Sequence, residues 1–164
     1  YHKDLAATEI VKLDTDGAKE TSSDFANTRP TSSVLSSFTT GVSGRRVIAY
    51  CWSEIPGFSK FGTYTGNEDD DGPFVYCGFK PALLIVKRTD STSSWGMYDS
   101  SRNSTNPWNK YLVADLPGAE GTATFGDFLS NGFKWRYTGA MNKSGATYIF
   151  MAFAESPFQT ANAK

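Results

Sequence analysis

The chain has 164 residues, enough for one domain with its own hydrophobic core. Its net charge of -1 gives no basic stripe for a nucleic-acid backbone, and no apolar run approaches the ~20 residues of a membrane-spanning helix. Aromatic residues make up 15% of the chain and glycine is frequent, which is typical of pleated sheets joined by tight turns. We therefore expect one all-β domain that binds no nucleic acid and has no membrane span.

The first half of the chain predicts three strands. Residues 8–20 hold at most a turn or two of helix, because Gly17 and the Asp residues disfavour it. Residues 45–52 (RRVIAYCW) are β-branched and aromatic and precede a Pro-Gly turn signal, which predicts a strand. Residues 61–66 (FGTYTG) and 72–79 (GPFVYCGF) predict two more strands on either side of an acidic loop.

The second half predicts a buried strand and a hairpin. Residues 82–86 (ALLIV) form an apolar run whose length suits a strand buried on both faces. Asn131-Gly132 is a preferred hairpin turn, and Phe133 and Trp135 then alternate with basic residues, as in a half-buried strand. Further strands are expected at residues 94–99, 110–116 and 146–155. Short strands at regular spacing predict an antiparallel sandwich or barrel. Of the two we favour a β-sandwich of the jelly-roll or concanavalin A-like type.

Two phrases in the chain resemble each other. Residues 43–58 (SGRRVIAYCWSEIPGF) and 144–158 (SGATYIFMAFAESPF) share five identities at a constant offset of 101 residues. We interpret this as an internal duplication, with halves of about 1–58 and 79–158 inside one domain of residues 1–164. The first half lacks a counterpart of residues 78–97, so we expect a neighbouring chain or an upstream segment to complete the sheet near Tyr1. This favours a homo-oligomer.

Two features bear on the chain's context. Cys51 and Cys77 both lie in apolar, strand-like sequence, which fits either a disulfide or, as we favour, two small buried hydrophobic residues. The chain begins YHKDL, without an initiator Met or a signal-peptide pattern, so we expect a piece or a processed product of a longer protein.

Four phrases carry a resemblance that spans nearly the whole chain. They are CWSEIPGFSKFGTYTGN, DGPFVYCGFKPALLIVKRTDS, DFLSNGFKWR and GATYIFMAFAESPF. They resemble a family of virion-associated proteins of tailed bacteriophages, found in marine and cyanobacterial phages, that often lie beside concanavalin A-like lectin modules. The resemblance implies a β-rich structural, tail or fibre component of the virion. It implies no catalytic residue. Many relatives carry a Gly- and Asn-rich loop where this chain is acidic.

The acidic loop is a candidate calcium site. Carboxylate and amide oxygens suit Ca²⁺, but an EF-hand loop spaces its acids at alternate positions, and this loop does not. The alternative is a solvated hairpin tip whose charge keeps a sheet edge from pairing. If calcium binds, the candidate ligands are Asn67, Asp69, Asp70 and Asp71.

Catalysis has weak support. Glu54 and Glu155 hold matching places in the two related phrases, so we expect equivalent positions rather than the facing pair of a glycosidase. We expect them to accept backbone amides in turns. The single histidine, His2, has no metal-ligand spacing to a second His or Cys, and its place at the chain start disfavours a rigid catalytic role.

A polar loop around Trp108 is the candidate recognition site. Sugar binding commonly uses an exposed aromatic ring beside polar side chains, and Trp108 follows Pro107 in polar sequence. We therefore expect Trp108 to be the Trp least buried in the core, Trp52 and Trp135 to be buried, and Trp95 to be either. Contact with another subunit is the alternative use of this loop. The candidate glycan- or partner-binding residues are Asp99, Arg102, Asn103, Asn106, Trp108 and Asn109.

The sequence thus predicts a non-enzymatic, virion-associated structural or fibre subunit that acts by assembly and surface recognition, in the virion or outside the cell. A lectin-like adhesin that binds host-surface glycan is the main alternative. A polysaccharide depolymerase is a weaker one. No cofactor is expected apart from the candidate calcium.

Overall fold

The computed structural model describes residues 1–23, 30, 31, 33–35, 46 and 48–156. All strands are antiparallel, and the described residues contain no helix. A small sheet pairs β1 (Glu9–Ile10) with β2 (Glu20–Thr21). The other eight strands are β3 (Ser59–Thr65), β4 (Phe74–Tyr76), β5 (Leu83–Arg88), β6 (Gly96–Asp99), β7 (Trp108–Val113), β8 (Gly121–Leu129), β9 (Gly132–Trp135) and β10 (Thr147–Phe153).

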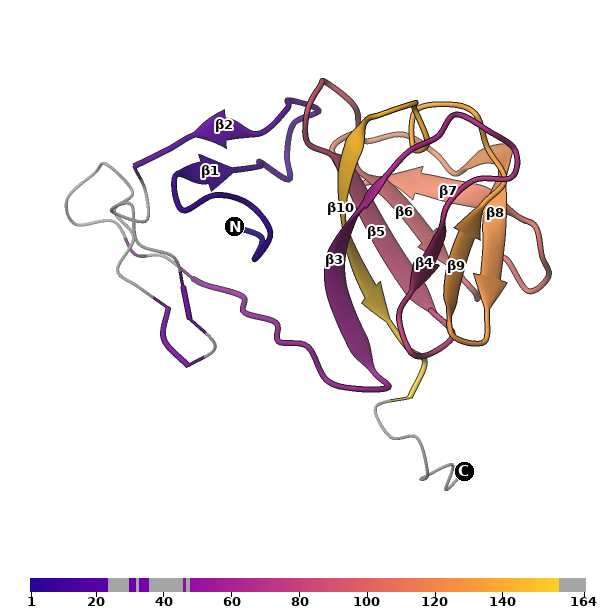
Figure 1. Ribbon diagram of the computed structural model, residues 1–164, viewed down its shortest axis with the longest axis horizontal. Helices are drawn as coiled ribbons and strands as arrows, with labels where there is room; N and C mark the ends of the chain where they lie inside the picture. The colour runs from indigo at the N-terminus through magenta and orange to yellow at the C-terminus, as the bar shows by residue number, and fades with distance from the viewer. Residues whose placement is uncertain (24–29, 32, 36–45, 47, 157–164) are drawn as a thin grey trace.

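These eight strands form one continuous sheet in the order β3-β10-β5-β6-β7-β8-β9-β4. The sheet curls until its two end strands, β3 and β4, lie on the same side of the domain (Figure 1). The sheet is therefore nearly closed. Closure is incomplete because β3 and β4 do not pair with each other. We call the interruption between β3 and β4 the seam. The predicted antiparallel all-β class is confirmed, whereas the arrangement as a sandwich of two sheets is not.

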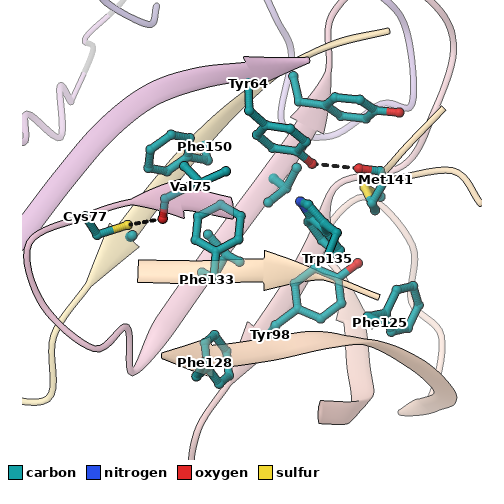
Figure 2. Packing of buried hydrophobic residues seen from close by; sticks show 14 of the residues in the cluster. Tyr64, Val75, Cys77, Tyr98, Phe125, Phe128, Phe133, Trp135, Met141 and Phe150 are labelled. Atoms are coloured by element: carbon teal, nitrogen blue, oxygen red, sulfur yellow. Dashed lines mark hydrogen bonds between the residues drawn. The ribbon is translucent and has the colours of Figure 1, made fainter. Parts of the chain in front are cut away.

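Aromatic side chains fill the inside of the curled sheet. Alternate residues of each strand point inward, as the period of two requires, and in β9 these are Phe133 and Trp135. Figure 2 shows their rings among those of neighbouring strands. Tyr64 stacks on Tyr148 with 4.7 Å between ring centroids and donates its hydroxyl to the Met141 carbonyl at 2.8 Å. This interior is the main core of the domain.

The N-terminal segment covers part of the outer face. Leu5 packs with Trp95 and Ile149 in a second buried cluster on that face. Lys87 is fully buried there and donates to the carbonyls of Asp16 and Ser93 at 2.9 and 2.6 Å. These contacts tie residues 1–22 to β5 and β10. Burial lowers the Lys87 pKa, and the nearby Asp115 charge opposes that shift.

Several sequence predictions are confirmed in this half of the sheet. Phe133 and Trp135 are buried while Lys134 and Arg136 are more exposed, as the alternation predicts. The β8–β9 hairpin exists, although its two-residue turn is Ser130-Asn131, one residue earlier than predicted, because Leu129 pairs with Gly132. In β5, Leu84 and Val86 are fully buried and Ile85 packs against the outer cluster, which fits the predicted two-sided burial.

The two related phrases adopt different structures, which corrects the expectation of matching strands. β10 lies between β3 and β5, whereas residues 48–54 belong to no strand and are exposed. The ends of both phrases, residues 43–45 and 157–158, lie outside the described residues. A strand keeps its form only when its backbone groups are paired, and in the described part of this chain no strand pairs with residues 48–54, although the Ser53 carbonyl accepts the Ser59 hydroxyl. The described residues of the two phrases thus do not form matching strands, and the duplication itself stays a prediction.

Two further sequence predictions concern the cysteines and membrane-spanning helices. Both thiols are free. Cys77 is a small buried residue, as favoured, and burial raises its pKa to about 12. Cys51 is exposed, so the expectation that it is buried was wrong. In the parts of the chain described, no helix is long and apolar enough to cross a bilayer.

Candidate functional site

Trp108 lies in the core, so the prediction that it is the least buried Trp was wrong. Its side chain has no exposed surface, and its ring lies 4.2 Å from that of Phe128, centroid to centroid. The loop ends at Pro107, and Trp108 is the first residue of β7, opposite Gly126. Because Gly126 has no side chain, it leaves the space that the indole fills. A ring in this position cannot stack on a sugar.

The loop before Trp108 uses its polar groups on itself. The buried Asn103 side chain donates to the carbonyls of Asp99 and Lys110 and accepts from the amides of Asn109 and Lys110, all at 2.8 to 3.0 Å. These four hydrogen bonds of the Asn103 side chain fix the loop to the start of β7. They use both donors and both acceptor positions of the amide group, so Asn103 has none left for a hydroxyl group of a ligand.

The other predicted loop residues are also mostly engaged. Asn106 makes both side-chain hydrogen bonds with the backbone of Phe128, at 2.8 and 2.9 Å. Arg102 pairs with Asp99 at 2.6 Å and lies 3.7 Å from Glu120. Asn109 is exposed. The structure thus brings the six predicted residues together, as a self-bonded loop around a buried Trp.

The acidic loop between β3 and β4 is also internally bonded. The fully buried Asn142 donates to the Asn67 side chain and to the Asp69 carbonyl at 3.0 Å, and it accepts from the Asn67 amide at 2.9 Å. The Asp69 carboxylate accepts the Asp71 amide at 2.7 Å. These bonds hold the loop in place as a connection between the two end strands.

Basic residues pair with the carboxylates of this loop. Asp71 lies 2.7 Å from Lys134, and Glu68 pairs with Lys143. Hydrogen bonds from these lysines lower the pKa of both carboxyl groups. In the described ranges, no three His, Cys, Asp or Glu side chains are grouped as metal ligands. Calcium binding stays a prediction, and a melting temperature that falls with chelator would support it.

Glu54 has the backbone role that the sequence predicts. Its carboxylate accepts the Phe61 amide at 3.2 Å and lies 3.2 Å from Lys60 and 3.8 Å from Lys3. Glu155 is exposed just after β10. His2 is buried against β10, with Nε2 3.3 Å from the Phe150 carbonyl, and burial lowers its pKa. His2 is thus held in the fold, contrary to the expectation from its place at the chain start.

The seam contains a cleft of about 400 Å³. β3 contributes residues 60–64, β4 contributes Phe74, Val75 and Tyr76, and Phe150 lies between them. Lys3 and Asp4 add a polar rim. Phe74 and Tyr76 are exposed, because β4 turns its Val75 side chain into the core. The cleft is therefore bordered by two strand edges, and its exposed lining is more polar than apolar although several aromatic residues contribute to it.

An exposed apolar segment precedes β3. Residues 48–54, which we call the aromatic arm, expose 78% of Ile48, 75% of Tyr50 and 62% of Trp52. The Tyr50 and Trp52 rings stack with centroids 6.4 Å apart. Large apolar side chains exposed together mark interaction sites more often than isolated ones do. The arm and the seam form our candidate binding surface.

The sequence alone did not reveal this surface, because the pattern of the arm is typical of a core strand. The alternation of Ile48, Tyr50 and Trp52 was visible, but alternation alone does not say whether a strand has neighbours. The signal in β4 was clearer. GPFVYCGF is apolar on both faces, and a three-residue end strand can bury only one of them.

Comparisons with known proteins give one match. A family model described as a domain of unknown function, DUF7483, matches residues 1–157. The comparisons with curated proteins and with solved structures found no match. Since the family model spans nearly the whole chain, this protein belongs to the DUF7483 family of domains of unknown function.

Proposed function

We propose that this domain is a structural subunit of a phage particle or fibre and that it acts by assembly rather than by chemistry. The exposed aromatic arm carries the proposal, because its three large side chains at alternate positions are what a strand presents to a partner. The open seam supports it, because an unpaired edge invites a further strand. The resemblance to virion-associated phage proteins supplies the place, in the virion.

The proposal includes the finer fold class, a jelly-roll or concanavalin A-like sandwich. The curled eight-stranded sheet with a filled interior is compatible with that class. It also includes completion of the sheet by a neighbouring chain. We assign this completion to the seam, because the cleft there includes Lys3 and Asp4, which are close to Tyr1 in sequence.

A lectin-like role is the second candidate, now centred on Trp52. The stacked rings of Tyr50 and Trp52 are exposed and offer flat apolar faces of the kind that sugar rings bind. A glycan array tests this role. Binding should fall in Trp52→Ala and persist in Asn109→Ala, whose side chain belongs to the Trp108 loop. Equal binding by the parent chain and Trp52→Ala would exclude the arm as a sugar site.

Sedimentation of the full chain over its attainable concentration range tests assembly. We expect the average mass to rise with concentration and the Ile48→Ser, Tyr50→Ser, Trp52→Ser triple variant to stay monomeric. The substituted side chains are exposed, so the variant should fold normally. A parent chain that stays monomeric at every concentration would overturn the proposal.

A further inference from the structure

The edge of β3 at the seam has free backbone groups. The Phe61 amide points away from β10, since its hydrogen bond goes to the Glu54 carboxylate. Strand residues two apart direct their backbone groups the same way, so the Thr63 amide and carbonyl also point into the seam. Thr63 is exposed there. The C-terminal half of β3 therefore has free backbone groups with which another strand can pair.

The edge of β4 faces it with the same property. Pro73 and Cys77 make their backbone bonds toward β9, through Trp135 and Asn131. By the same alternation, the amides and carbonyls of Phe74 and Tyr76 point away from β9 and toward the seam. Two open edges thus border the cleft.

The bridge between the residue after the arm and β3 defines a register in which the arm could pair with the open edge of β3. Ile55 forms a β-bridge with Ser59 around the turn that contains Gly57, whose φ is 78°. Continuing that antiparallel register sets Cys51 opposite Thr63 and Trp52 opposite Gly62. Gly62 has no side chain, and the Phe150 ring of β10 already covers it, since a Cβ there would lie 2.9 Å from that ring. In this register Tyr50 and Trp52 face the inside of the sheet, toward the cleft.

In its own chain, the arm does not take this place. The chain turns away from β3 at Glu54, which occupies the Phe61 amide and pairs with Lys60. Figure 1 shows the segment before β3 running away from the sheet instead of along β3. The arm is therefore exposed, and the strand edge that its own register fits stays open.

We propose that the aromatic arm of one copy adds as a strand to the β3–β4 seam of a second copy. The inference rests on the proposed assembly function and names its partner, a second copy of this chain. If two copies exchange arms, each copy contributes its arm and its seam to the contact in the same way. The result is a closed, symmetric dimer. Pairing covers the free edges of β3 and the exposed rings of the arm together.

A disulfide test uses the native Cys51. The Thr63→Cys variant places a second thiol opposite it in the proposed register, and directly facing strand residues bring Cβ atoms within disulfide reach. Cys77 does not compete, because burial raises its pKa to about 12 and its thiol stays protonated. We expect oxidation to give a covalent dimer, with mass spectrometry locating the bond between residues 51 and 63. Thr122→Cys, an exposed β8 position away from the seam, is the control and should give little dimer.

The outcomes separate this inference from the proposed function. A monomer with an internal bond between residues 51 and 63 would show that the arm closes its own seam, and it would overturn the inference. Assembly in sedimentation without that bond would overturn the inference while leaving the assembly function in place. A monomer without the bond would overturn both. In the chain without an added cysteine, Trp52→Asp should weaken dimer formation at least tenfold, and unchanged association would also overturn the inference.

Discussion

Trp108 and Trp52 place the same side chain in two very different regions. Trp108 lies where β7, β8 and β9 all have paired neighbours, and its ring is fully buried. Trp52 lies in the arm beside the one interruption of the sheet, and it is 62% exposed. The flanking sequences suggest the reverse, since Trp108 sits in a polar loop and Trp52 in an apolar run. Burial here follows from whether a strand has neighbours, not from the local polarity of the sequence.

The largest expected difference in stability is between two single variants, in which either Trp108 or Trp52 is replaced by alanine. Trp108→Ala should lower the free energy of unfolding by about 3–5 kcal/mol, because it leaves a cavity beside Phe128 and Trp135. Trp52→Ala, measured at a concentration where the chain is monomeric, should change it by less than about 0.5 kcal/mol. Urea denaturation of both variants measures the difference. Equal losses would mean that the arm is part of the monomer's core.

A matched pair of glycines sharpens the same contrast. In Gly126→Ala the new methyl group would overlap the Lys134 carbonyl and lie 2.9 Å from Cζ2 of Trp108. We expect a loss of about 1–3 kcal/mol from this overpacking. In Gly118→Ala the methyl group meets nothing within 4 Å, so stability should be unchanged or slightly higher. Thermal melts compare the two, and a stable Gly126→Ala would contradict the tight packing of Trp108.

The loop before Trp108 gives a third, smaller effect. Asn103→Ala removes four hydrogen bonds to the backbone and should cost about 1–2 kcal/mol, since some of the abandoned groups lie near enough to the surface to meet water. The control is Asn109→Ala, whose exposed side chain should contribute little. If chemical denaturation shows equal stability for both variants, the self-bonded loop is not what holds the start of β7.

Lowering the pH should have the smallest effect on stability, and this effect arises in the acidic loop between β3 and β4. The pKa values of Glu68 and Asp71 are lowered by their lysine partners, so the stability from these pairs is present at neutral pH. It is lost as the pH falls below the ordinary values of 4.5 and 3.8 and through the lowered ones. Both carboxylates are exposed, so the loss is small. Because Lys134 pairs with Asp71, Lys134→Gln should flatten the pH dependence of the melting temperature below about 3.8, and an unchanged slope would contradict the pairing.

Sequence patterns predicted the closed side of the sheet well. In β5 and β9 the apolar run and the alternation reflect burial directly, because both strands have two neighbours. The same reasoning failed for residues 48–52, which belong to no strand although the sequence pattern of residues 45–52 is as strand-like as that of β10. Pairing partners come from the whole topology, which a local pattern does not contain. The burial of Trp108 was hidden for a related reason, since it depends on Gly126 in another strand.

The most direct test of the central claim is amide hydrogen exchange at Thr63, Phe74 and Tyr76, measured in dilute and in concentrated solution. We predict fast exchange at these seam amides when the chain is dilute and slower exchange when it is concentrated, because an added strand then bonds them. Amides of β5, which pair on both sides already, should exchange equally slowly in both solutions. Seam amides that are equally protected at every concentration would show that the sheet closes without a second copy.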